Sequence, residues 1–203
     1  MKNLNIYINE KLKIVHKSSY SCTPQSRAEL REIIKERLED NPNADLNDID
    51  VSNITNMSSL FKDLDPHNID ISQWDVSNVE NMHYMFYDCN KFNADLSRWD
   101  VSNVEDMHDM FAYCKKFNSD LSNWDVSNVE YMDFMFYECT NFNSDISGWN
   151  VSKVEDMSYM FKRCAKFNSD INDWDVSNLR NISWMFDGCD SMKELPDWYM
   201  NHR

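Results

Sequence analysis

NSDLSNWDVSNVEYMDFMFYECTNF, at residues 118–142, is the stretch that decides the architecture, because nearly the same 25 residues recur before and after it. Valine returns at positions 51, 76, 101, 126, 151 and 176, and phenylalanine at 61, 86, 111, 136, 161 and 186. Six units therefore fill residues 43–192. A unit of this length cannot bury its own apolar side, so neighbouring copies must stack on one another.

Each unit is predicted to contain one short strand and one short helix. Trp124 and Val126 lie two residues apart, as on one face of an extended segment. Ser127 and Glu130 form a capping box, and apolar residues then keep helical spacing as far as Cys139. The pattern predicts an α/β repeat fold in which the strands of successive units lie parallel.

The segments that flank the repeats are predicted to cap the stack, because its end units would otherwise expose apolar faces. Residues 1–42 are expected to form an N-terminal cap. It would contain a β-hairpin in the alternating stretch 4–14 and a helix that starts at Thr23-Pro24 and ends at Asn41-Pro42. Residues 193–203 are expected to form a C-terminal cap.

The consensus FNxDLSxWDVSNVxxMxxMFxxC resembles that of the BspA-like leucine-rich repeat family over about residues 43–192. The resemblance implies a right-handed leucine-rich-repeat-like solenoid, with one short parallel strand and one short helix per unit. It also implies a protein that binds other proteins, often at a cell surface. Because the sequence shows no leader, lipobox or anchor, we expect a leaderless bacterial or phage version that acts in the cytoplasm rather than at the surface.

The repeats carry a strong negative charge. The chain has a formal net charge of −15, and residues 51–192 hold 24 acidic residues against 10 basic ones. Such a surface repels phosphate backbones and anionic lipid, so binding to nucleic acid or to a membrane is not expected. No apolar run is long enough for a signal-peptide core or a membrane span. The charge instead favours a protein partner with a basic surface.

The cysteines indicate packing rather than chemistry. Five of the six recur at equivalent positions, 89, 114, 139, 164 and 189, so we expect free, buried thiols. His83 and His108 share a register, but Asp133 and Ser158 follow in it, so no metal site is predicted. Because a nucleophile motif and a phosphate loop are also missing from the sequence, we predict neither enzymatic activity nor a cofactor.

Aspartate recurs in two registers, at 45, 70, 95, 120, 145 and 170 and at 50, 75, 100, 125 and 175. Carboxylates stacked at the ~4.8 Å spacing of neighbouring strands repel one another unless something compensates. They could accept hydrogen bonds from turn N–H groups, bind calcium, or present a row of charge to a partner. Calcium-binding solenoids have glycine-rich turns, whereas this chain has two glycines.

Positions at which the copies differ carry the functional prediction. On the predicted helix the register of residue 134 faces water, yet it holds Tyr84, Asp109, Phe134, Tyr159 and Trp184. Nearby outer positions add Tyr87, Tyr113, Tyr131 and Tyr137. Either these rings form a protein interface, or the helix is shorter or rotated and the rings pack between units.

These observations predict a non-enzymatic protein–protein interaction module that presents an acidic, aromatic surface to a basic partner and is a monomer when free. The predicted partner-binding residues are Tyr84, Tyr87, Tyr113, Tyr131, Phe134, Tyr137, Tyr159, Trp184, Asp75, Asp100, Asp125, Asp175, Arg98 and Asn123. A structural role, as a spacer or oligomer subunit, stays open, and so do two alternative binding functions. One is a phage-type inhibitor of a host defence nuclease, in which the aspartate rows mimic nucleic acid. The other is an adhesin-like surface protein.

Overall fold

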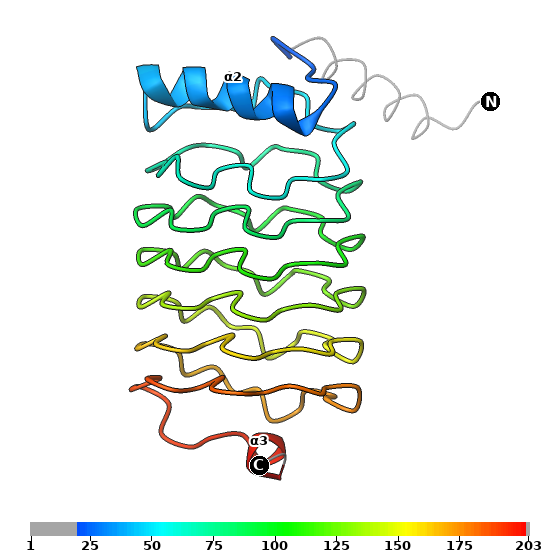
Figure 1. Ribbon diagram of the computed structural model, residues 1–203, viewed down its shortest axis with the longest axis vertical. Coiled ribbons are helices and arrows are strands. Elements are labelled where there is room, and N and C mark those ends of the chain that lie inside the picture. The colour runs from blue at the N-terminus through cyan, green and yellow to red at the C-terminus, as the bar shows by residue number, and fades with distance from the viewer. Residues whose placement is uncertain (1–19, 202–203) are drawn as a thin grey trace, which may run out of the picture.

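The computed structural model describes residues 20–201, and the repeats in it form a column of stacked coils (Figure 1). Parallel bridges in one register join successive coils, at Asn56, Asn81, Asp106, Tyr131, Asp156 and Asn181. The helices of the described residues lie at the two ends of the column, α2 (Arg27–Asp40) and α3 (Asp197–Asn201). The hairpin predicted in residues 4–14 lies outside the described residues.

The prediction of a helix in every unit is wrong. Phe134 N–H donates to Ser158 O at 2.9 Å, and Phe136 N–H donates to Met160 O at 3.0 Å. Both acceptors lie in the next coil, whereas an α-helix needs acceptors four residues earlier. Left-handed backbone at Phe134 and Glu138, with φ of 54° and 57°, also interrupts any helical path.

The predicted capping box and strand are wrong as well. Glu130 N–H donates to Glu105 O of the preceding coil at 2.9 Å, so no helix begins at Ser127. Trp124 N–H turns back onto Leu121 O at 3.1 Å, which breaks an extended strand. The repeats consist of turns and isolated bridges, and the α/β, leucine-rich-repeat-like solenoid is not the fold of this chain.

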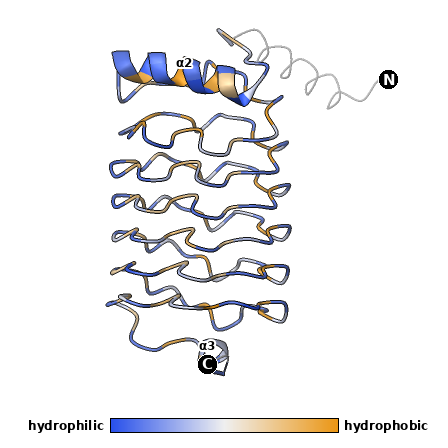
Figure 2. Ribbon diagram, viewed as in Figure 1, coloured by the Kyte–Doolittle hydropathy of each residue, from blue (hydrophilic) through white to orange (hydrophobic). Residues whose placement is uncertain are grey.

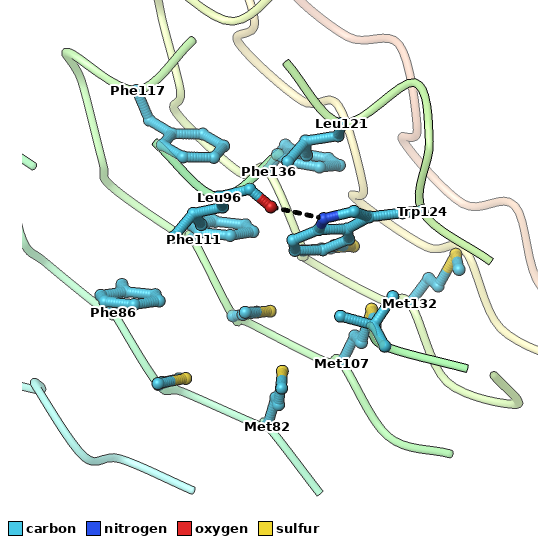
Figure 3. Packing of buried hydrophobic residues seen from close by; sticks show 14 of the residues in the cluster. Met82, Phe86, Leu96, Met107, Phe111, Phe117, Leu121, Trp124, Met132 and Phe136 are labelled. Atoms are coloured by element: carbon cyan, nitrogen blue, oxygen red, sulfur yellow. Dashed lines mark hydrogen bonds between the residues drawn. The ribbon is translucent and has the colours of Figure 1, made fainter. Parts of the chain in front are cut away.

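The core consists of columns in which like residues stack on like (Figure 3). The ring centroids of Phe111 and Phe136 lie 5.6 Å apart, and those of Phe136 and Phe161 lie 5.7 Å apart. Each buried repeat indole donates to a carbonyl of the previous coil, as Trp124 Nε1 does to Leu96 O at 3.0 Å. Hydrophobic and hydrophilic residues therefore alternate in the same way around every coil (Figure 2).

The five repeated cysteines lie in this core as free, buried thiols, as predicted. Each thiol donates to a phenylalanine carbonyl of the previous coil, for example Cys139 Sγ to Phe111 O at 2.9 Å. Burial raises the pKa of the Cys189 thiol to about 12, and it likewise raises the pKa of the Cys114, Cys139 and Cys164 thiols. These cysteines are therefore packing residues.

Helix α2 lies within the range in which the sequence predicts a helix. The predicted start at Thr23 is too early, because Ser26 is the N-cap and its Oγ accepts the Glu29 N–H at 3.2 Å. Leu30 and Ile34 of α2 are fully buried in the hydrophobic core. The helix therefore covers the apolar end of the column.

Arginine side chains of α2 satisfy carbonyl groups of the first coil. Inside the column, a carbonyl in this part of a coil accepts an N–H from the preceding coil, and within residues 20–201 the first coil has no such neighbour. Arg27 donates to Ser58 O, and Arg31 donates to Leu60 O at 2.6 Å and to Lys62 O at 2.7 Å. The guanidinium groups thus stand in for the missing coil.

Aspartates of both registers act as acceptors in turns. Asp125 Oδ1 accepts Ser127 N–H at 3.0 Å, and hydrogen bonding from this serine lowers the pKa of the carboxyl. Asn150, which interrupts the row, accepts Ser152 N–H at 3.2 Å. The other aspartates of the two registers likewise accept a hydrogen bond from the backbone N–H of the residue two positions later. They are Asp45, Asp50, Asp70, Asp75, Asp95, Asp100, Asp120, Asp145, Asp170 and Asp175.

Phe136→Ala tests the stacked core. Phe136 is fully buried between Phe111, Phe142 and Phe161, so its truncation leaves a cavity and removes ring contacts. We expect the free energy of unfolding to fall by about 3–5 kcal/mol. Urea unfolding followed by tryptophan fluorescence measures it. Asn123→Ala, at an exposed position, is the control with an expected change below about 0.5 kcal/mol; similar midpoints for both variants would contradict this core.

The turn carboxylates predict how stability depends on pH. Hydrogen bonds from the serine two residues on lower the pKa of Asp95, Asp120 and Asp145. A lowered pKa means that this stabilisation is present above the unfolded pKa of about 4 and is lost as the pH falls through the folded pKa. An asparagine side chain accepts the same hydrogen bond and does not titrate. The variant in which Asp95, Asp120 and Asp145 are all replaced by asparagine should therefore unfold at a lower pH than the native chain.

An acid titration followed by tryptophan fluorescence tests this expectation. The matched control replaces Asp173, Asp190 and Asp197, which are exposed and accept no turn N–H in residues 20–201, by asparagine. It removes the same charge, and its acid midpoint should move less. An equal shift in the two triple variants would show that net charge, rather than the turn bonds, sets the acid stability.

Candidate functional site

Two positions in every coil have left-handed backbone. The first register comprises Ser59, Tyr84, Asp109, Phe134, Tyr159 and Trp184, with φ between 54° and 60°. The second comprises Asp63, Asp88, Tyr113, Glu138, Arg163 and Gly188. This conformation favours glycine, asparagine and aspartate and costs other residues about 1–2 kcal/mol. Aromatic residues nevertheless occupy four of the six places in the first register.

The rings from these turns meet across neighbouring coils. Tyr87 and Tyr113 lie 5.4 Å apart between centroids, Tyr113 and Tyr137 lie 5.1 Å apart, and Phe134 and Tyr159 stack at 4.5 Å. We define the aromatic stripe as Tyr84, Tyr87, Tyr113, Phe134, Tyr137, Tyr159 and Trp184. Its rings pack between coils, as one alternative predicted, but they lie outside the buried core and remain partly accessible.

A lysine lies over the stripe near each of its ends. Lys62 Nζ is 4.7 Å from the ring centroids of both Tyr84 and Tyr87. Lys162 Nζ is 4.9 Å from the ring of Trp184, which is 58% exposed. The faces of these rings therefore already bind cations within the chain.

Asp109 takes the stripe register in the third coil and is buried. Burial raises its pKa to about 6, while a hydrogen bond with Tyr84 lowers it. Burial and the neighbouring tyrosines raise the pKa of Tyr113 to about 12. Burial likewise raises the pKa of Tyr84 and Tyr87. These phenols are therefore neutral near pH 7, and their hydroxyl groups can donate hydrogen bonds.

Other predicted residues lie in different registers from the stripe. Tyr131 is 44% exposed and belongs to the bridge register, between Asp106 and Asp156. Arg98 and Asn123 are exposed directly before the buried tryptophan of their coils. The carboxylates of Asp75, Asp100, Asp125 and Asp175 are exposed in the turn that follows this tryptophan. The structure thus brings together seven of the eight predicted aromatic residues and places the charged ones elsewhere on the coil.

The stripe ends at a groove of about 450 Å³ beside α3. Its lining residues are Ile182, Ser183, Trp184, Phe186, Asp187, Leu195 and Tyr199. In inner coils the N–H at this place donates to the next coil, as Tyr159 N–H does to Ser183 O at 2.9 Å. Within residues 20–201 the N–H groups of Trp184 and Phe186 have no such acceptor. The groove therefore combines apolar side chains with open backbone donors, and none of the sequence patterns predicted it.

The helices of residues 20–201 are all too short or too polar to cross a lipid bilayer.

Comparison with known proteins identifies the family. The chain matches the family model described as "Mycoplasma protein of unknown function, DUF285" over residues 29–137 and 119–202. Searches among curated proteins and among solved structures found no match. The two matched segments together cover most of the chain and include every coil, which agrees with the resemblance to a repeat family. The chain therefore belongs to the DUF285 family.

Proposed function

We propose that this chain is a non-enzymatic protein-binding module that engages a basic partner through the aromatic stripe. The observation that supports the proposal is the placement of Tyr84, Phe134, Tyr159 and Trp184 at left-handed turns. Ser59 and Asp109 form the same turn in their own coils without a ring. The turn itself therefore does not require an aromatic residue.

Folding energetics give these rings little advantage. The left-handed conformation costs each of them about 1–2 kcal/mol relative to an ordinary backbone conformation. Contacts such as the stack of Phe134 on Tyr159, at 4.5 Å, contribute about 0.5–1.5 kcal/mol per pair beyond the burial of the rings. The strain and the ring contacts nearly cancel, so the partial burial of the rings is the main term that favours folding. Tyrosine and tryptophan are, however, the residues that protein interfaces enrich, so binding explains their presence better than stability does.

Charge indicates the chemistry of the partner. The chain carries a net charge of −15, which attracts a basic surface and speeds encounter. Lys62 and Lys162 show that rings of the stripe accept an ammonium group on their faces. We infer that arginine or lysine side chains of the partner bind the remaining ring faces in the same way, and that the phenol hydroxyl groups donate hydrogen bonds at the rim.

A second candidate function is that of a phage-type inhibitor that occupies the nucleic-acid groove of a nuclease. The supporting observation is the row of exposed carboxylates at Asp75, Asp100, Asp125 and Asp175, each oriented by a serine N–H. The row is a sparser array of charge than duplex DNA, which has about one charge per 1.7 Å. Its residues lie apart from the stripe, so variants can separate the two functions.

Asparagine substitutions in the stripe test the leading proposal. The variant with Tyr84, Phe134, Tyr159 and Trp184 replaced by asparagine keeps the net charge and suits the left-handed turns. We expect it to lose, by at least about tenfold in affinity, the partner that the native chain captures from host lysate. Relief of strain offsets the lost ring contacts, so its free energy of unfolding should fall only by the partial burial of the four rings, and the variant should stay folded.

The matched control replaces the four row carboxylates, Asp75, Asp100, Asp125 and Asp175, by asparagine. This control should retain the partner if the stripe is the binding surface. Loss of the partner in the control, together with retention in the stripe variant, would support the nucleic-acid mimic instead. Unfolding of the stripe variant would assign its rings to stability.

The ionic-strength dependence of the purified complex provides a separate test. An acidic surface that only accelerates encounter should give an association rate that falls with salt and a dissociation rate that changes little. A nucleic-acid mimic should lose affinity steeply with salt, because its contacts replace phosphates. Surface plasmon resonance between low and physiological salt distinguishes the two, and a complex indifferent to salt would contradict a basic partner.

A further inference from the structure

His83, Asp106 and His108 form a compact group beside the stripe, in the second and third coils. His83 Nδ1 lies 3.3 Å from Asp106 Oδ2, and His108 Nδ1 lies 2.7 Å from Asp106 Oδ1. One ligand atom of each residue lies within 4.8 Å of the other two. The two imidazole rings stack with centroids 4.8 Å apart. Two imidazole nitrogens are therefore directed at a single carboxylate.

The turn at this place does not need the imidazoles. In five coils an amide or carboxylate oxygen accepts the N–H two residues on, at Asn56, Asn81, Asp106, Asp156 and Asn181. The residue that donates this N–H is serine at positions 58, 158 and 183. Serine therefore serves the fold in this register. The turn bond therefore does not explain why His83 and His108, the two residues of this register next to the Asp106 carboxylate, are histidines.

The surroundings of the group favour a cation. The charges of Asp109 and Asp133 both act on His108, in addition to that of Asp106. The charge of Lys62 acts on Asp109, and its ammonium group already lies over Tyr84. The side chains of His83, His108 and Asp106 are 32%, 27% and 20% exposed, so an ion from solution can reach them.

We propose that His83, Asp106 and His108 bind a divalent first-row transition-metal ion of the Zn²⁺ class. Two imidazole nitrogens and one carboxylate oxygen are a donor set that zinc accepts in sites with one open position, whereas Mg²⁺ and Ca²⁺ prefer oxygen ligands. Tetrahedral ligands about 2.1 Å from zinc lie about 3.4 Å from one another. His83 Nδ1 lies 3.3 Å from Asp106 Oδ2, and His108 Nδ1 lies 2.7 Å from Asp106 Oδ1, so the two distances end on different oxygens. For all three residues to bind one ion, the carboxylate must rotate, and the stacked imidazole rings, whose planes are 24° apart, must tilt toward each other.

Metal titrations of the full chain, free of any polyhistidine tag, test the site. Calorimetry with Zn²⁺ should show one equivalent bound, and Co²⁺ should give the intense visible absorption of a tetrahedral ion with nitrogen and oxygen ligands. Asp106→Asn and His108→Ser should each weaken Zn²⁺ binding by at least about tenfold and abolish the Co²⁺ band. Both substitutions copy residues that other coils hold in these registers, so the fold should survive them.

His67→Asn is the control, because this histidine lies in the first coil, outside the group, and contacts Lys91. It should bind Zn²⁺ as the native chain does. Circular dichroism spectra that match the native chain establish that the Asp106 and His108 variants are folded. A native chain that takes up neither ion, or folded variants with native affinity, would overturn the proposal and leave the group as a hydrogen-bonded pair of histidines.

Discussion

Backbone hydrogen bonds from one coil to the next are the constraint on which the rest of the structure depends. The N–H of Phe111, Phe136 and Phe161 each donates to a carbonyl 24 residues later, at 2.9–3.1 Å. This ladder fixes the register, so each residue stacks on its equivalent in the neighbouring coils. Each side chain must therefore pack against an identical or similar side chain in the next coil. Phenylalanine and methionine do so in the core, whereas stacked aspartates need the serine N–H groups that the turns supply.

The ladder of backbone hydrogen bonds stops at the first coil and at the last coil, and different backbone groups are left at the two ends. At the first coil the open groups are carbonyls, and Arg27 and Arg31 of α2 donate to them. At the last coil, the groups without a backbone partner among residues 20–201 are N–H donors, next to the groove that Trp184 lines. Helix α3 continues the tryptophan column, because Trp198 Nε1 donates to Ile171 O at 2.9 Å. The core is thus closed at both ends, while one backbone edge stays accessible at the end of the stripe.

The sequence predicts the period, the stacking and the buried residues, because these follow from repetition and hydrophobicity alone. It misleads on local structure, because apolar residues three apart suit a helix and also a coil that turns every few residues, as at Met132 and Met135. Left-handed turns are usually recognised from glycine or asparagine, and the register of Phe134 shows neither. Phe134 lies outside the core because of this turn, and not because of the outer helix face from which its exposure was predicted.

Several residues that depart from the repeat consensus lie close together in space, and no pattern in the sequence predicted this contact. His83 and Asp106 are 23 positions apart in the sequence, and the stacking of coils brings the Asp106 carboxylate within 3.3 Å of the His83 ring. Tyr84 of the stripe contacts the rings of both His83 and His108, at 5.7 Å and 5.0 Å between centroids. The hydrogen-bond ladder and the core explain why most residues repeat from coil to coil. They do not explain the residues at which the second and third coils depart from the repeat. An ion bound by the two histidines would lie beside the ring of Tyr84, at one end of the stripe.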